Sequence, residues 1–138
     1  MYPEQLVSPM RADLTEVGFE EFKTADEVVN HLEDHKGTTF LVINSVCGCA
    51  AGAARPGVKM AIQNATKKPD NMTTVFAGVD HDAVAKAREY TAPYPPSSPA
   101  MALFKNGELV HFIERHHIEG TPADVIGNHL VQVFEEYC

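Results

Sequence analysis

The residues with the clearest chemical potential are two cysteines, Cys47 and Cys49, separated by a single glycine in the stretch NSVCGCAAGAARPG. Such a pair can hold half of a metal site, close a structural disulfide or work as a redox couple. The chain has three cysteines, and the third, Cys138, is its last residue. A structural disulfide framework needs an even set of cysteines spread along the chain, so this spacing argues against one.

Thiol–disulfide exchange would divide the work between the two cysteines. A thiolate at a helix N-terminus is stabilised by unpaired amides and the helix dipole, which lowers a cysteine pKa from about 8.5 toward neutrality. Cys47 is therefore the expected nucleophile. Cys49 can attack a mixed disulfide formed at Cys47 and release the substrate, which makes it the resolving cysteine. Gly48 is the spacer, because a residue without Cβ adapts most easily to a small ring. We expect that ring to be strained and the pair to be oxidising.

Two other interpretations of the cysteines stay open at this stage. The pair could bind zinc or copper(I) if His111, His116 or His117 completed the ligand set, although the chain has no second cysteine pair. Both thiols could also be small buried side chains without chemistry. The run Arg115–His117 is expected to be a solvated turn, and Cys138 an accessible thiol on a fraying terminus.

The elements around the cysteines predict where the pair lies. Thr38–Asn44, TTFLVIN, is a continuous β-branched and aromatic run, typical of a strand buried on both faces. From Ala50 to about Thr66, Ala, Met and Ile recur at helical spacing, and we expect Pro56 to kink this helix or break its first turns. The pair therefore lies where a buried strand leads into a helix, at the carboxyl end of the strand where α/β active sites gather.

The rest of the chain predicts an α/β fold with a central mixed sheet and helices on both faces. Thr24 and Glu27 match a capping box, and Asn106-Gly107 is a strong hairpin signal because both turn positions tolerate positive φ. The start, around Met10 to Phe22, is ambiguous. We expect one domain over residues 1–138. Its further elements are a helix over Ala25–Lys36 ending at Gly37, a strand over Thr73–Val79, a helix from Asp80 to about Tyr90, the hairpin, and a terminal helix with Thr121 as cap, Pro122 at its first position and Val125, Ile126, Leu130, Val133 and Phe134 on its buried face.

A proline-rich loop, TAPYPPSSP, directly precedes the first hairpin strand. We expect the Ser98–Pro99 bond to be cis and to lie against the cysteine loop, where the backbone before Pro99 can pair with an extended peptide or a thiol substrate. An ordinary trans proline is the alternative. Ser98 and Pro99 are accordingly the predicted substrate-binding residues.

The composition limits the partners. The 138 residues include 11 Lys and Arg against 19 Asp and Glu, for a formal net charge of -8, without a basic cluster. This balance argues against nucleic acid or an anionic membrane as a partner. No apolar run approaches the roughly 20 residues that a transmembrane helix needs, and the N-terminus lacks the pattern of a signal peptide. We expect a cytoplasmic protein, a setting in which disulfides are mostly transient and catalytic.

Several stretches resemble one family. NSVCGCAAGAARP is similar to the motif of the bacilliredoxins, which are thioredoxin-like proteins with Cys-Gly-Cys in place of Cys-x-x-Cys. SSPAMALFKNGELV resembles the cis-proline, strand and hairpin of thioredoxin. KKPDNMTTVFAGVD, APYPPSSPAMAL, HFIERHHIEG and the final EYC extend the likeness through nearly the whole chain. The resemblance implies a thioredoxin fold and a thiol–disulfide oxidoreductase that removes bacillithiol from S-bacillithiolated proteins.

The resemblance also implies how the site residues share the reaction. Cys47 would take bacillithiol from the client protein, and free bacillithiol or Cys49 would then clear the adduct, with Pro99 as the cis-proline beside the site. Bacillithiol is then a thiol co-substrate, the partners are S-bacillithiolated or disulfide-bonded client proteins, and no bound cofactor or metal is expected. The alternatives are a protein disulfide isomerase or general disulfide reductase and, in another class, a Cys/His metal-binding protein.

Overall fold

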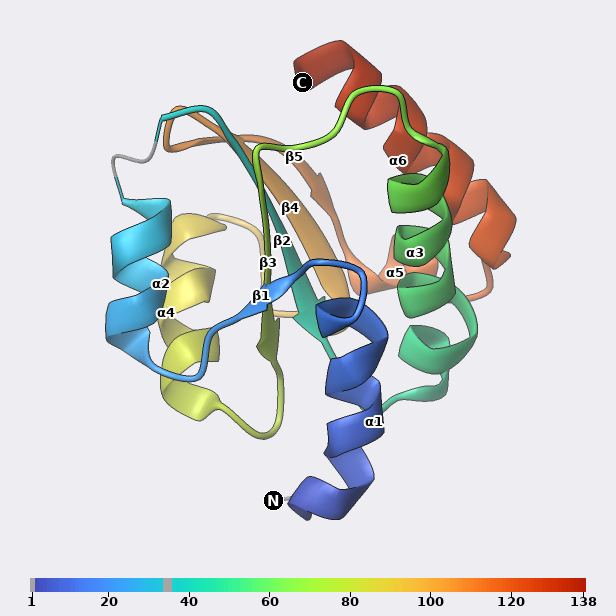
Figure 1. Cartoon of the computed structure of the whole chain (residues 1–138). Coiled ribbons are helices and arrows are strands. Elements are labelled where there is room, and N and C mark those ends of the chain that lie inside the picture. Colours follow the sequence, from blue (N-terminus) through green and yellow to red (C-terminus); the bar gives the residue numbers. More distant parts are fainter. Residues whose placement is uncertain (1, 34–35) are drawn as a thin grey trace.

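A computed structural model of the chain describes residues 2–33 and 36–138 and contains a five-stranded sheet between two layers of helices (Figure 1). In spatial order the strands are β1 (Glu20–Glu21), β3 (Asn71–Phe76), β2 (Thr38–Asn44), β4 (Ala100–Lys105) and β5 (Glu108–Ile113). β1, β3 and β2 are parallel, whereas β4 runs antiparallel to both β2 and β5. The predicted mixed α/β sheet is confirmed.

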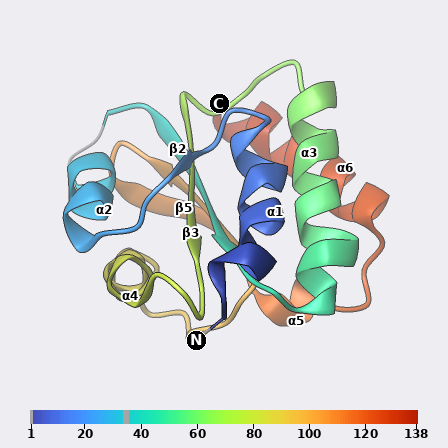
Figure 2. The same ribbon diagram turned by 60° about the horizontal axis from the view of Figure 1, so that its bottom comes forward.

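The two helical layers are α2 and α4 on one face of the sheet and α1, α3 and α6 on the other (Figures 1 and 2). The central strand β2 explains this arrangement, because all seven of its residues are buried. Phe40 and Val42 join the core beneath α3 and α6, whereas Leu41 and Ile43 join the core beneath α2 and α4. The helical elements are α1 (Glu4–Thr15), α2 (Ala25–Leu32), the π-helix η1 (Ala50–Ala54), α3 (Arg55–Asn64), α4 (His81–Tyr90), α5 (Arg115–Ile118) and α6 (Ala123–Tyr137).

Several local predictions are confirmed in atomic detail. β2 has the predicted bounds, and Thr24 and Glu27 form the reciprocal bonds of a capping box. Asn106 and Gly107 both have positive φ, 52° and 82°, as the hairpin turn requires. The first predicted helix ends at Leu32 instead of Lys36, and residues 34–35 of that prediction lie outside the described part of the chain.

The prediction for the face of the terminal helix was wrong at one residue. Val125 is 50% exposed, whereas Ile126, Leu130 and the other predicted members are buried. At 100° per residue, Val125 points roughly 130° away from the centre of the buried stripe. The predicted cap also differs, because Pro122 takes the N-cap position and the Thr121 hydroxyl donates to the His117 carbonyl instead.

The N-terminal segment, which the sequence left ambiguous, forms α1 and β1, and an ion pair of Arg11 with Glu21 connects these two elements. This guanidinium is buried, and its Nη1 lies 2.7 Å from the Asp80 carboxylate and 2.8 Å from that of Glu21. Burial alone would lower the pKa of Arg11, but the hydrogen bonds to these two carboxylates raise it above its ordinary value. Asp80 holds the N-cap position of α4, yet its side chain binds Arg11 and does not cap the helix.

In the part of the chain that the structure describes, no helix combines the length and the apolar character needed to cross a membrane.

Candidate active site

β2 delivers the cysteine pair to one end of the sheet. Asn44 is the last residue of β2, helical backbone begins at Gly48, and it runs through η1 into α3. The Cys47 carbonyl accepts the amides of Ala50 and Ala51, at 3.0 and 3.2 Å, so Cys47 stands at the entrance of this helix. The unpaired amides of a helix N-terminus favour an anion, which is the environment that promotes a thiolate.

Cys47 and Cys49 are joined as a disulfide, with their Cα atoms 5.5 Å apart. Both cysteines are half-buried, whereas Gly48 between them is exposed. A Cβ added to Gly48 would meet no atom within 4 Å. The pair therefore sits on an open loop that an incoming disulfide can approach. The roles of Cys47 as nucleophile and Cys49 as resolving residue stay predictions.

The short segment between β2 and the helix is held by polar contacts. The Ser45 hydroxyl accepts the Cys47 amide at 3.2 Å, and the Asn44 side chain accepts the Ser45 amide at 2.9 Å. Asn44 and Ser45 are both buried. Arg55, at the start of α3, donates to the same segment from the inside of the protein. The sequence interpretation missed Arg55, although an arginine within an otherwise apolar, alanine-rich helix was a signal for it.

The proline loop lies beside the cysteine loop. The Ser98–Pro99 peptide is cis, and Pro99 is buried. Ala100, the first residue of β4, pairs with Ile43 of β2. Pro99 therefore stands level with the last residue of β2, and the two loops leave adjacent strands at the same end of the sheet. The assignment of Ser98 and Pro99 to substrate binding stays a prediction.

Two arginines support this proline loop, and the sequence interpretation missed both. Arg88 of α4 donates to the Ser97 carbonyl at 3.1 Å, and Arg115 of α5 donates to the Ser98 carbonyl at 3.3 Å. The Arg115 amide also donates to the Ser97 hydroxyl, at 3.3 Å. Burial lowers the pKa of Arg88. Helices from two parts of the chain thus fix the backbone that precedes Pro99.

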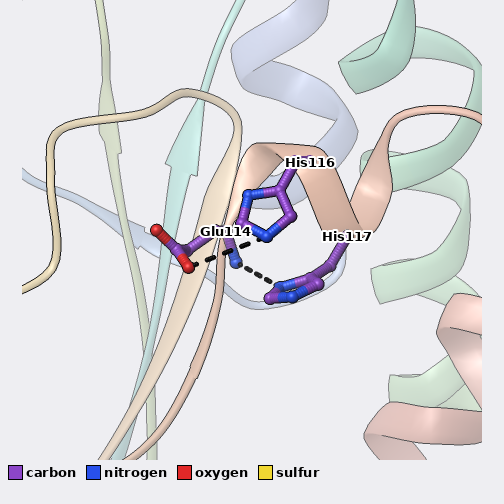
Figure 3. A group of neighbouring side chains, drawn as sticks. All are labelled: Glu114, His116 and His117. Atoms are coloured by element: carbon purple, nitrogen blue, oxygen red, sulfur yellow. Dashed lines mark hydrogen bonds and ion pairs between the residues drawn. The ribbon is translucent and has the colours of Figure 1, made fainter.

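The histidines at 116 and 117 form part of a one-turn helix, α5, and are exposed to solvent (Figure 3). Among the described residues, one group of three potential metal ligands gathers within 4.8 Å, namely Glu114, His116 and His117, and it contains no cysteine. The Glu114 amide donates to His117 Nδ1 at 3.3 Å, so the neutral ring carries its proton on Nε2. In this arrangement His117 offers no free lone pair to a metal ion.

His111 lies elsewhere, on β5, and faces α6. Its Nε2 atom is 3.0 Å from Nε2 of His129, beside a cavity of about 390 Å³. Burial lowers the pKa of His111, and so does the neighbouring His129. One ring donates and the other accepts in this pair, so the two imidazoles satisfy each other.

Cys138 lies at the opposite end of the sheet. The residue is exposed at the surface, but partial burial of its sulfur raises the pKa of the thiol, and a hydrogen bond with Thr38 opposes that rise in part. Thr38 begins β2, whereas Asn44 ends it, and seven residues of strand span about 20 Å. Cys138 therefore cannot reach the Cys47–Cys49 pair of the same molecule in this conformation.

Comparisons with known proteins agree with this architecture. Solved structures of a reduced thioredoxin pre-protein from Schistosoma mansoni and of an oxidised thioredoxin from Plasmodium falciparum each align with a TM-score of 0.56. They cover 86% and 88% of this chain and 96% and 100% of their own, at 16% and 12% identity. The fold is therefore that of thioredoxin, as predicted. A thioredoxin fold with a cysteine pair at a helix entrance is the arrangement of the thiol–disulfide oxidoreductases.

The sequence comparisons are more specific. A family model described as "Disulphide isomerase" matches residues 2–138. A bacilliredoxin of Cytophaga hutchinsonii is 60% identical over 136 residues, covering 99% of both chains. A bacilliredoxin of Bacillus cereus is 54% identical over 137 residues, covering 99% of this chain and 95% of its own. The chain belongs to the bacilliredoxin family, which confirms the resemblance found in the sequence.

Proposed function

We propose that this protein, acting as one thioredoxin-like domain in the cytoplasm, removes bacillithiol from S-bacillithiolated proteins. The observation that carries the proposal is the Cys47–Cys49 pair, held at a helix entrance and close enough to form a disulfide. The names of the relatives at 54 to 60% identity support the same reaction. Cys47 is the proposed nucleophile, Cys49 the resolving residue and Gly48 the spacer between them.

The proposed reaction is a pair of exchanges at sulfur. The Cys47 thiolate attacks the bacillithiol sulfur of the client's mixed disulfide, that S–S bond breaks, and the client cysteine leaves as a thiolate. The Cys49 thiolate then attacks the Cys47 sulfur, bacillithiol leaves as a thiolate, and the Cys47–Cys49 disulfide closes. Alternatively, a second bacillithiol attacks the adduct at its bacillithiol sulfur, which regenerates Cys47 and forms bacillithiol disulfide. A thiol reductant must return the closed pair to the dithiol.

The proline loop is proposed to hold the substrate during the first exchange. Ser98 and Pro99 lie level with the end of β2, next to the loop that carries Cys47. Ser98 is half-buried, and an extended peptide can bind accessible backbone at such a position by main-chain hydrogen bonds, which do not depend on the side chains of the client. This mode of binding suits an enzyme whose clients share a modified cysteine and no other feature.

The test is intact-protein mass spectrometry of Cys49→Ser, made together with Cys138→Ser so that Cys47 is the sole thiol. After incubation with a bacillithiolated protein, we expect one bacillithiol on Cys47, removed by reductant, and one free thiol on the client for each adduct. The matched control, Cys47→Ser with Cys138→Ser, should acquire no adduct and release no client thiol. Absence of any adduct on the Cys49 variant would refute the proposal.

The description of the matching family model favours a second candidate function, disulfide isomerisation. In that case the Cys49 variant should accumulate a protein–protein disulfide between Cys47 and a client, without bacillithiol. The wild type should also speed the recovery of activity of a client refolding from scrambled disulfides. The same mass spectra therefore separate the two functions.

A further inference from the structure

Arg55 is a buried cation placed directly behind the cysteine loop. Only 3% of the residue is exposed, although it carries a positive charge. It begins α3, one π-helical segment after the cysteine pair. Buried arginines are rare unless their donors are used, so the contacts of this side chain indicate what it does.

The Arg55 guanidinium joins the two residues that lead from β2 to Cys47. Its Nη1 atom donates to the Ser45 carbonyl at 2.8 Å and to the Asn44 side-chain oxygen at 3.0 Å. The same Asn44 oxygen accepts the Ser45 amide, and its amide nitrogen donates to the Met10 carbonyl at 3.1 Å. Every polar atom of the Asn44 side chain is therefore engaged, and Arg55 bonds to both residues of the segment that leads to Cys47.

The charge of Arg55 is only partly balanced by its neighbours. Its Nε atom donates to Asp13 at 3.0 Å, but the Asp13 side chain is 43% exposed, so water screens its negative charge. Lys59 lies 3.8 Å from the same carboxylate and adds a second positive charge. Arg55, Lys59 and Asp13 together carry one net positive charge. Arg55, which is the buried residue of the three, contacts the segment before Cys47.

We infer that Arg55 is a positioning residue for the exchange reaction, which fixes the Asn44–Ser45 turn and favours the thiolate of Cys47 through its buried charge. This inference rests on the proposed function only in that it concerns the same nucleophile. The Ser45 carbonyl that Arg55 binds lies two residues before Cys47, so guanidinium and sulfur are on the order of 10 Å apart. At that distance and an effective dielectric constant of about 20, one charge shifts a thiol pKa by about one unit.

The test uses proteins in which Cys49 and Cys138 are both serine, so that Cys47 is the sole thiol. The rate of iodoacetamide alkylation against pH gives the pKa of Cys47 without any client protein. We expect Arg55→Met to raise that pKa by about one unit and to slow alkylation severalfold near neutral pH. Lys86→Met, which removes a charge from α4 on the other face of the sheet, is the matched control and should leave the pKa unchanged.

Asp13→Asn tests the same inference with the opposite sign, at a side chain that is 43% exposed. Removal of the screened carboxylate leaves Arg55 less balanced, so the pKa of Cys47 should fall. Arg55→Lys retains the charge without the planar fork, so its thiol pKa should stay near that of the parent while its exchange rate falls. The inference is overturned if folded Arg55→Met, or Arg55→Gln where the former does not fold, leaves the pKa of Cys47 unchanged. Failure of the parent to exchange would contradict the proposed function alone, because alkylation needs no exchange.

Discussion

The close contact between α3 and α6 predicts the effect of a single methyl group. A Cβ added at Gly57 of α3 would lie 2.8 Å from Cγ2 of Ile126 and 2.9 Å from its Cβ, and 3.0 Å from the Ala123 carbonyl oxygen. The last two are parts of α6 that cannot turn aside. Gly57→Ala must therefore move one helix against the other, and α3 is the helix that follows the cysteine pair.

The magnitude follows from two opposing effects. Alanine is about 1 kcal/mol more favourable than glycine inside a helix. Overpacking of a core costs about 1–3 kcal/mol, and immovable neighbours place this site near the upper value. The net loss for Gly57→Ala is then about 2 kcal/mol, which corresponds to a decrease in Tm of roughly 6–10 °C for a chain of this size.

The assay is urea and thermal unfolding followed by far-UV circular dichroism, with the cysteine pair oxidised throughout. Gly52→Ala is the matched control, because Gly52 lies in η1 and an added Cβ would meet no atom within 4 Å. That variant should gain up to about 1 kcal/mol. If Gly57→Ala proved as stable as Gly52→Ala, the argument from close packing would be wrong.

Two further predictions concern buried charge and pH. Arg11→Met should cost about 3 kcal/mol in urea unfolding at pH 7, because it leaves the nearly buried carboxylates of Glu21 and Asp80 without their cation. An unchanged free energy of unfolding would contradict this. The pKa of His111 is lowered in the folded protein, so the unfolded chain binds this proton more readily. Protonation therefore destabilises the folded protein, and the loss of stability grows as pH falls below about 6.5. Wild type should therefore lose Tm relative to His111→Gln between pH 7 and 5, with no such divergence above pH 7.5, and parallel Tm curves would refute the assignment.

Local sequence signals predicted the part of the site that lies on consecutive residues. β2, the cysteine pair and the hairpin each depend on residues a few positions apart, so hydrophobic runs, glycine and turn propensity were sufficient to place them. The same signals predicted that Cys47 and Cys49 lie together at the end of a buried strand. Ser98–Pro99 was expected beside them because it directly precedes the first hairpin strand.

The residues that support the site could not be predicted in the same way. Arg55 contacts Asp13, 42 positions earlier, and the two side chains come together only when α1 packs beside α3. Similarly, α1 contains Pro9 in its interior, which weakens the helical pattern that the sequence displays. Val125 was misplaced because an apolar residue at a helix start was counted with the stripe although it lies off that face.

The position of Cys138 makes the molecule convenient to anchor. When the Cys47–Cys49 pair is oxidised, Cys138 is the free cysteine of the described chain, and it is exposed. A maleimide linker would therefore attach at the end of the sheet remote from the cysteine loop. Protein immobilised in this way should present its redox face outward to passing clients, with every copy in the same orientation.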